Sequence, residues 1–210
     1  MSQEQSEAKF KKIREWLETK HVGQAFQPAI AWPELRVFNR KDLRSVAAYW
    51  RRLPHWELAD STYFITFRVR NTLGEILKES SLASLVEEVL WFGHGERYVL
   101  HAYVIMPNHI HLLLNPLEGW SLAKILQGIK GFSSMQVNKI LQRKGAFWQD
   151  ESFDHVIRNE EDWLDKFNYI HNNPVMAGLV TMPQDYLFSS LVTMHSEGRL
   201  ESLPHIQGPI

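Results

Sequence analysis

The stretch from residue 103 to residue 114 reads YVIMPNHIHLLL and places His109 and His111 one residue apart in an apolar run. This run is too short and too rich in strand-forming residues for a helix, so it predicts two strands, at 98–105 and 109–114, joined by a tight connection. Side chains alternate along a strand, so both imidazoles project from the same face. Two neighbouring imidazoles on a rigid strand have the chemistry to ligate one divalent cation.

Hydrophobic periodicity predicts the elements on either side of this run. In chain order they are a strand at 63–69, a helix at 78–92, the two strands above, a helix at 121–141 capped by Ser121, a short strand at 153–157 and a helix at 159–172 capped by Asn159. Pro174 disfavours helical geometry in the residue before it, so the last helix is expected to end near Asn172. This order predicts an α+β fold with a ferredoxin-like antiparallel sheet flanked by helices.

The chain is predicted to divide into three parts. Residues 1–57 form an N-terminal extension that is mainly helical, with helices near 4–19 and 40–50 and a linker at 21–33. Residues 58–182 form the main domain, and residues 183–210 form a C-terminal tail.

Composition narrows the class of protein. An apolar fraction of 44% and an aromatic fraction of 12% are sufficient for a packed core. The absence of cysteine excludes disulfides and a thiolate nucleophile and fits a reducing compartment. Since no apolar run reaches the roughly 18 residues of a spanning helix, we expect a cytoplasmic protein with no membrane contact.

The net charge of −1 does not by itself point to nucleic acid, but the charges are unevenly distributed. Residues 119–149 contain no acid and five cationic side chains, at Lys124, Lys130, Lys139, Arg143 and Lys144. Such a cluster is either a solvated face or a surface for the phosphates of a nucleic acid.

The last predicted helix carries a tyrosine away from its buried stripe. Helical spacing places Tyr169 on the same flank as Asp162, Lys166 and Asn173, and Tyr169 and Asn173 are spaced to face one target. A free phenol has a pKa of about 10 and therefore needs a metal or a base close by to act as a nucleophile. A histidine-bound cation together with this tyrosine would be equipped to cut a phosphodiester through a covalent protein–DNA link.

Each feature taken alone has a simpler explanation. A His-x-His pair is often structural, an exposed helical tyrosine is often a surface aromatic, and Asn172-Asn173-Pro174 is typical of a helix end. Their occurrence together, with a basic helix between them, favours the catalytic interpretation.

The combined motifs resemble those of the REP-associated tyrosine transposases, members of the HUH endonuclease superfamily. The resemblance covers residues 61–191 and depends on the Met-Pro-Asn-His-x-His run that ends at His111 and on the Tyr-x-x-x-Asn-Pro-Val run that starts at Tyr169. It implies that His109, His111 and Asn173 hold Mg²⁺ or Mn²⁺. It also implies that Tyr169 attacks single-stranded DNA, leaving a 5′-phosphotyrosine and a free 3′-OH.

The resemblance further implies a substrate, single-stranded or hairpin DNA with a REP-like palindrome, and hence a nucleoid-associated protein active in DNA transposition or recombination. On this basis the five cationic side chains between residues 119 and 149 are expected to contact the DNA backbone. Three aromatic residues, Trp120, Phe147 and Trp148, either stack on bases or belong to the core. Asp154 and His155 either orient a ligand or the tyrosine, or pair with each other.

Two other functions stay open at this point. One is a catalytically silent DNA-hairpin-binding protein. The other is a phosphohydrolase that uses histidine nucleophiles, although Leu113 stands where a third alternating histidine would be. The sequence also leaves open whether the protein is a monomer or a homodimer, and hence whether Tyr169 serves its own subunit or a partner's.

Overall fold

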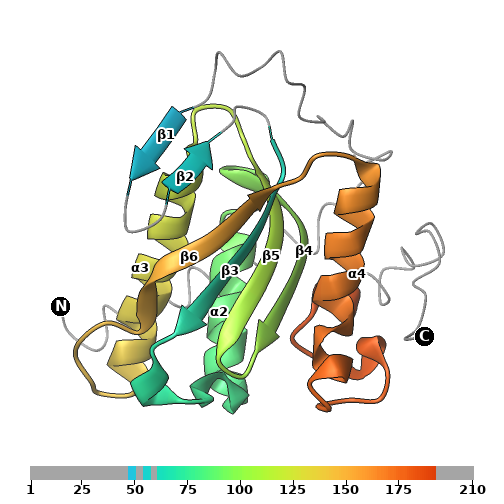
Figure 1. The fold of residues 1–210 in the computed structure, drawn as a ribbon. Helices are drawn as coiled ribbons and strands as arrows, with labels where there is room; N and C mark the ends of the chain where they lie inside the picture. Colours follow the sequence, from blue (N-terminus) through green and yellow to red (C-terminus); the bar gives the residue numbers. More distant parts are fainter. Residues whose placement is uncertain (1–46, 51–53, 58–60, 193–210) are drawn as a thin grey trace, which may run out of the picture. The chain divides into compact units, whose positions relative to one another are not determined.

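The computed structural model describes residues 47–50, 54–57 and 61–192. In chain order the elements are β1 (Ala47–Trp50), β2 (Pro54–Glu57), β3 (Tyr63–Val69), α2 (Ser80–Phe92), β4 (Tyr98–Met106), β5 (His109–Pro116), α3 (Leu122–Ile140), β6 (Trp148–Val156) and α4 (Glu160–Met176), with short 3₁₀ helices at Asn71–Leu73, Ile76–Lys78 and Pro183–Asp185 (Figure 1). None of the helices in these ranges has both the length and the apolarity needed to cross a membrane.

Strands β3 to β6 form one antiparallel sheet in the order β4-β5-β3-β6. With α2 after β3 and α3 after β5, the chain follows the β-α-β-β-α-β pattern of ferredoxin-like folds, and α4 is added at its end. The α+β fold predicted from the sequence is therefore confirmed.

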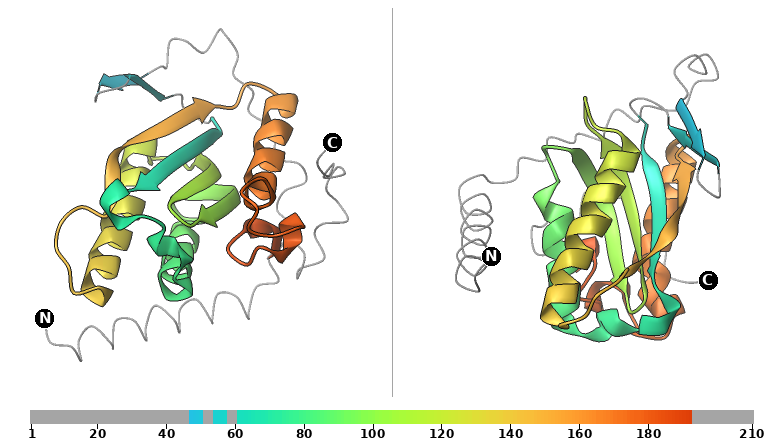
Figure 2. Two further views of the ribbon diagram at one scale, coloured as in Figure 1. Left: turned by 60° about the horizontal axis from the view of Figure 1, so that its bottom comes forward. Right: turned by 90° about the vertical axis from the view of Figure 1, so that its left-hand side faces the viewer.

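The two faces of the sheet are covered by different helices (Figure 2). Ile65, Phe67, Ile110 and Leu112 project from one face and pack with the apolar sides of α2 and α3 in the main core. Helix α4 lies on the opposite face, where it contacts β4 and β5. Because side chains alternate along each strand, the histidines at 109 and 111 belong to the α4 face.

The segment after α4 binds along the edge of β4. The backbone N–H of Ile105 donates to the carbonyl of Phe188 at 2.9 Å, and the hydroxyl of Tyr186 donates to the carbonyl of Ile105 at 2.8 Å. The ring Nε2 of His171 in α4 lies 2.8 Å from the hydroxyl of Ser190, which accepts from the backbone N–H of Tyr103. These bonds connect the C-terminal half of α4 to β4 and shield part of a sheet edge.

The prediction of a short helix near residues 40–50 is wrong for residues 47–50, the part that the structure describes. Residues Ala47–Trp50 form a strand that pairs antiparallel with Pro54–Glu57. A helix this short is only marginally stable, and Pro54 lies close to its end. The neighbouring strand provides backbone hydrogen bonds in its place. The helix predicted at 4–19 and the linker at 21–33 lie outside the described residues.

Two predicted boundaries also differ from the structure. Strand β6 starts at Trp148 rather than at Phe153, and α4 continues through Pro174 to Met176. Pro174 has no N–H to donate to the carbonyl of Ile170, so it removes one backbone hydrogen bond from α4, and the helix ends two residues later at Met176. The helix caps expected at Ser121 and Asn159 are confirmed.

A Gly93→Ala substitution should destabilise the fold. Gly93 has helical backbone angles that alanine accepts, but an added Cβ would lie 2.7 Å from the hydroxyl oxygen of Tyr98. Tyr98 is buried and donates to the carbonyl of Leu90, so its ring cannot move away easily. We expect a loss of about 1–3 kcal/mol in the free energy of unfolding measured with urea.

The matched control is Gly131→Ala in α3, where an added Cβ meets no heavy atom within 4 Å. There the better helix propensity of alanine should raise the free energy of unfolding by up to about 1 kcal/mol. Equal effects of the two substitutions would contradict the packing assigned to Tyr98.

Candidate functional site

The two histidines at the start of β5 face each other. The Nε2 atoms of His109 and His111 lie 3.1 Å apart, and the ring centroids are 4.7 Å apart. Each histidine pairs with a residue of β3, His109 with Arg68 and His111 with Thr66. The pairing of β3 with β5 therefore holds both imidazoles next to each other on the face of the sheet that α4 covers.

Hydrogen bonds at the other ring nitrogens set the orientation of both rings. Nδ1 of His109 lies 2.6 Å from the side-chain oxygen of Asn108, and Nδ1 of His111 lies 2.7 Å from the hydroxyl of Thr66. When each Nδ1–H donates to these oxygens, both Nε2 lone pairs point into the same space.

Both imidazoles are held in the neutral form that metal ligation requires. Burial lowers the pKa of His109 to about 4 and that of His111 to about 3, and the positive charge of Arg68 acts in the same direction on each. A side-chain hydrogen bond with Asn173 acts in the opposite direction on the pKa of His109. At neutral pH neither ring carries a positive charge that would repel a cation.

The donor set fits a divalent cation. The two Nε2 atoms, 3.1 Å apart, share a hydrogen bond when one of them carries the proton, and they turn two lone pairs towards one cation when both Nδ1 atoms carry it. Asn173 contacts His109 and offers an amide oxygen beside them. Among the residues that the structure describes, no cluster of three or more His, Cys, Asp or Glu side chains is arranged to bind a metal. The proposed ligands are two neutral imidazoles and one amide, so they bring no negative charge to a bound cation.

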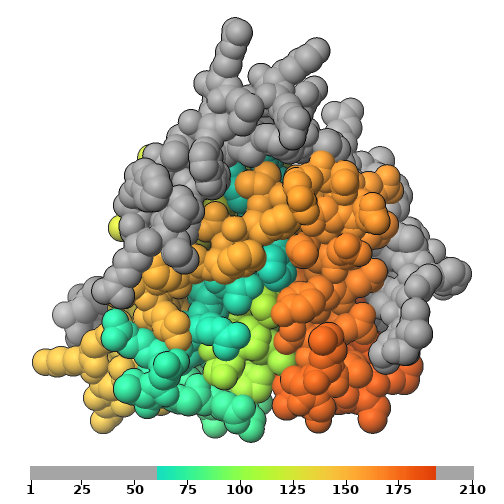
Figure 3. Space-filling model, viewed as in Figure 1, coloured from blue at the N-terminus to red at the C-terminus, as the bar shows by residue number. Residues whose placement is uncertain are grey.

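Tyr169 in α4 lies directly against this pair. Its ring centroid is 5.2 Å from that of His111 and 5.8 Å from that of Phe64. The side chain is 42% exposed, so the phenol remains accessible to a ligand. In the space-filling view the surface of α4 adjoins that of β3 and β5 on one face of the molecule (Figure 3). The four residues predicted as nucleophile and metal ligands thus meet within one chain.

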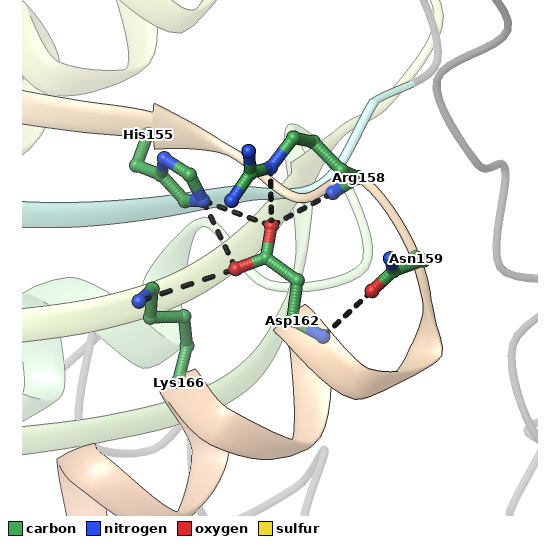
Figure 4. A network of polar contacts seen from close by, with 5 residues as sticks. All are labelled: His155, Arg158, Asn159, Asp162 and Lys166. Atoms are coloured by element: carbon green, nitrogen blue, oxygen red, sulfur yellow. Dashed lines mark hydrogen bonds and ion pairs between the residues drawn. The ribbon is translucent and has the colours of Figure 1, made fainter.

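A buried carboxylate holds the start of α4 to the sheet (Figure 4). Asp162 accepts from Nε2 of His155 in β6 at 2.9 and 3.0 Å and from the backbone N–H of Arg158 at 3.0 Å. Burial by itself would raise the pKa of Asp162, but the hydrogen bonds from His155 and Arg158 hold it below its usual value. His155 therefore positions the helix that carries Tyr169.

Asp154 is not part of this network. It pairs with Ile65, whereas His155 pairs with Phe64, so the two side chains project from opposite faces of β6. The expectation that Asp154 and His155 face the same site, or pair with each other, is wrong for this reason.

The five cationic residues predicted to bind DNA lie on or after α3, and α3 covers the face of the sheet opposite to the helix that carries Tyr169 (Figure 2). Lys130 donates to the carbonyl of Asp150, and Arg143 donates to the side-chain oxygen of Asn138. Phe147 and Trp148 are core residues, since they are almost fully buried, while Trp120 is partly exposed and stacks with Arg97.

Sequence reasoning missed several residues of the site, above all Thr66, Arg68 and Asn108. Phe64, Thr66 and Arg68 occupy alternate positions of β3, which is the signal that would have found them once β3 was paired with β5. Arg68 is exposed and has no ion-pair partner within residues 61–192. Its guanidinium group is therefore available to an anion next to the histidine pair.

The chain is similar to known proteins in sequence and in fold. A REP-associated tyrosine transposase of Escherichia coli K12 is 27% identical over 134 residues, which are 61% of this chain and 75% of that protein. The solved structure of a REP-associated tyrosine transposase bound to a REP hairpin matches 78% of this chain and 92% of its own, with a TM-score of 0.61 and 23% identity, and supports the fold.

The model of the family described as "Transposase IS200 like" matches residues 66–173, which include His109, His111, Tyr169 and Asn173. That match covers slightly more than half of the 210 residues. The chain therefore belongs to the IS200-like transposase family.

Proposed function

We propose that this protein is a metal-dependent nuclease and strand transferase that cuts single-stranded DNA beside a hairpin through a 5′-phosphotyrosine on Tyr169. The observation that carries the proposal is the placement of a half-exposed phenol, 5.2 Å from His111 between ring centroids, on a helix held rigidly to the sheet. Nucleophiles need this combination of access and fixed orientation.

The chain's own residues have separate roles in the reaction. The Tyr169 oxygen attacks the phosphorus, the bond from phosphorus to the 3′ oxygen breaks, and the phenolic proton is in net terms transferred to the released 3′-OH. The reverse attack by a 3′-OH rejoins a strand without an external energy source. Mg²⁺ or Mn²⁺, held by His109, His111 and Asn173, would polarise the phosphate and neutralise the charge that develops during the attack. Two imidazoles are an unusual ligand set for Mg²⁺, which prefers oxygen ligands, so oxygens of the scissile phosphate would have to contribute to its coordination.

Arg68 is proposed to bind the phosphate under attack. It lies across from His109, is exposed, and adds positive charge to a site without carboxylate ligands. A phosphate oxygen between the guanidinium and the imidazole pair would supply the negative charge that these groups do not have. The substrate would in this way complete the site.

Hairpin DNA is the proposed substrate because the similar solved structure is bound to a REP hairpin and the similar Escherichia coli protein is REP-associated. A chromosomal palindrome as substrate entails a cytoplasmic protein that associates with the nucleoid. The α3 cluster of Lys124, Lys130, Lys139, Arg143 and Lys144 is kept as a proposed backbone contact, but it lies away from Tyr169 and would touch the duplex stem rather than the cut strand. Since Tyr169 contacts His111 of its own chain, we propose a monomer that acts in cis.

Replacement of Tyr169 by phenylalanine should abolish the covalent adduct with hairpin-bearing single-stranded DNA in the presence of Mn²⁺. The ring and its contacts remain, and the side chain is exposed, so the free energy of unfolding should change by less than about 0.5 kcal/mol. The adduct is measured by gel electrophoresis under denaturing conditions.

Tyr186→Phe is the matched control, because it removes a hydroxyl that bonds to Ile105 and leaves the site intact. An adduct with Tyr169→Phe would refute the assigned nucleophile. DNA binding without an adduct in the wild type under every divalent metal would favour the catalytically silent hairpin-binding protein.

Arg68→Gln should slow adduct formation by about 10²-fold while DNA binding changes far less, because the lost charge acts mainly on the transition state. Arg70→Gln is the control, since Arg70 lies two residues further along and forms an exposed ion pair with Asp150 at 3.5 Å. Equal rates for the Arg68→Gln variant and the wild type would contradict the proposed phosphate contact.

A further inference from the structure

An open groove runs along α4 next to the nucleophile. It has a volume of about 470 Å³, which falls in the range of small-ligand sites. Its lining residues are Phe64, Asp165, Lys166, Asn168, Tyr169 and Asn172, together with Met176 at one end. Apart from Tyr169, none of these has a role in the reaction proposed above.

The walls of this groove combine aromatic and polar groups. The rings of Phe64 and Tyr169 meet edge to face, and Phe64 also stacks on His111 at 5.5 Å between centroids. The Lys166 ammonium lies 5.9 Å from the centroid of Phe64 and 4.0 Å from the carboxylate of Asp162. A flat ring could lie against the aromatic wall with a negative group close to Lys166.

One amide oxygen in the groove lacks a hydrogen-bond partner among the described residues. The Asn172 side chain donates from Nδ2 to the carbonyl of Asn168 at 3.0 Å. Its Oδ1 is shielded from solvent and has no hydrogen-bond partner among the described residues. Because this oxygen has almost no exposed area, a ligand N–H group would reach it only after a rotation of the Asn172 side chain, and the new hydrogen bond would then satisfy the acceptor.

We propose that this groove binds one unpaired nucleobase of the DNA strand, next to the phosphodiester that Tyr169 attacks. The base supplies a π face for the aromatic wall and an N–H donor for Asn172, and the phosphate of the same nucleotide supplies a negative charge for Lys166. The inference rests on the proposed function, because that function brings single-stranded DNA to Tyr169. A base bound in this groove would determine which phosphodiester reaches the oxygen of Tyr169.

A neighbouring aromatic side chain extends the same surface. Phe153 in β6 is 58% exposed, and its ring centroid is 6.3 Å from that of Phe64. An apolar ring this exposed on an edge strand has little packing role, and a second base of the strand could stack on it. The groove and Phe153 therefore form one path for a single strand across β3 towards α4.

The test uses the full-length Tyr169→Phe chain, which keeps the ring but cannot form the adduct, with Mn²⁺ and hairpin DNA that has a single-stranded flank. The fluorescent base 2-aminopurine is placed at each flank position in turn. We expect strong quenching at one position beside the cleavage site mapped with the wild type. Adding Asn172→Ala should weaken that quenching and lower the affinity for the flanked hairpin about fivefold.

Gln127→Ala in α3 is the control, because it also removes a helical amide, but one that is exposed and belongs to a helix on the other face of the sheet. Equal quenching at all positions, no quenching, or quenching that Asn172→Ala leaves unchanged would overturn the groove assignment. Adduct formation is scored separately in the wild type. Quenching without an adduct would refute the proposed function, and an adduct without position-specific quenching would refute the base site.

Discussion

The docking of α4 on the sheet is the constraint on which the site depends. Neither the histidine pair nor the tyrosine is useful alone, and they meet only because one helix crosses the face of β5. Asp162 secures the start of this helix to β6 through His155, and His171 secures its other half to β4 through Ser190. Anchors at both ends restrict the rotation that would carry the phenol of Tyr169 away from His111, so access and orientation are provided together.

The electrostatics of the site favour a phosphate ligand. The imidazoles are neutral, Arg68 is positive, and no carboxylate cluster balances a bound cation in the described part of the chain. A divalent cation is expected to bind weakly to such a site until a phosphate joins it. Metal, phosphate and tyrosine would therefore assemble together on the DNA, which restricts the chemistry to correctly placed strands.

The parts of the site that were predictable lie within single regular elements. Alternation along one strand predicts the shared face of His109 and His111, and helical spacing predicts the exposed flank of Tyr169. The roles of Thr66 and Arg68 could not be predicted, because they depend on the register between β3 and β5. Asp154 was assigned to the site from its strand, and the α3 lysines were assigned to DNA contact from their charge, whereas the face that each occupies depends on strand pairing and topology. The β1–β2 hairpin was missed because pairing between strands overrides a weak local helix preference.

The central claim is that Tyr169 serves the histidine pair of its own chain. The most direct measurement mixes Tyr169→Phe chains with His111→Ala chains and assays adduct formation on hairpin DNA with Mn²⁺, with the wild type as the positive control. One partner then has an intact histidine pair and the other an intact tyrosine. We predict no adduct from the mixture, because the two halves of the site lie in different molecules. An adduct from the mixture would show that the tyrosine acts on a neighbouring chain and would contradict this account.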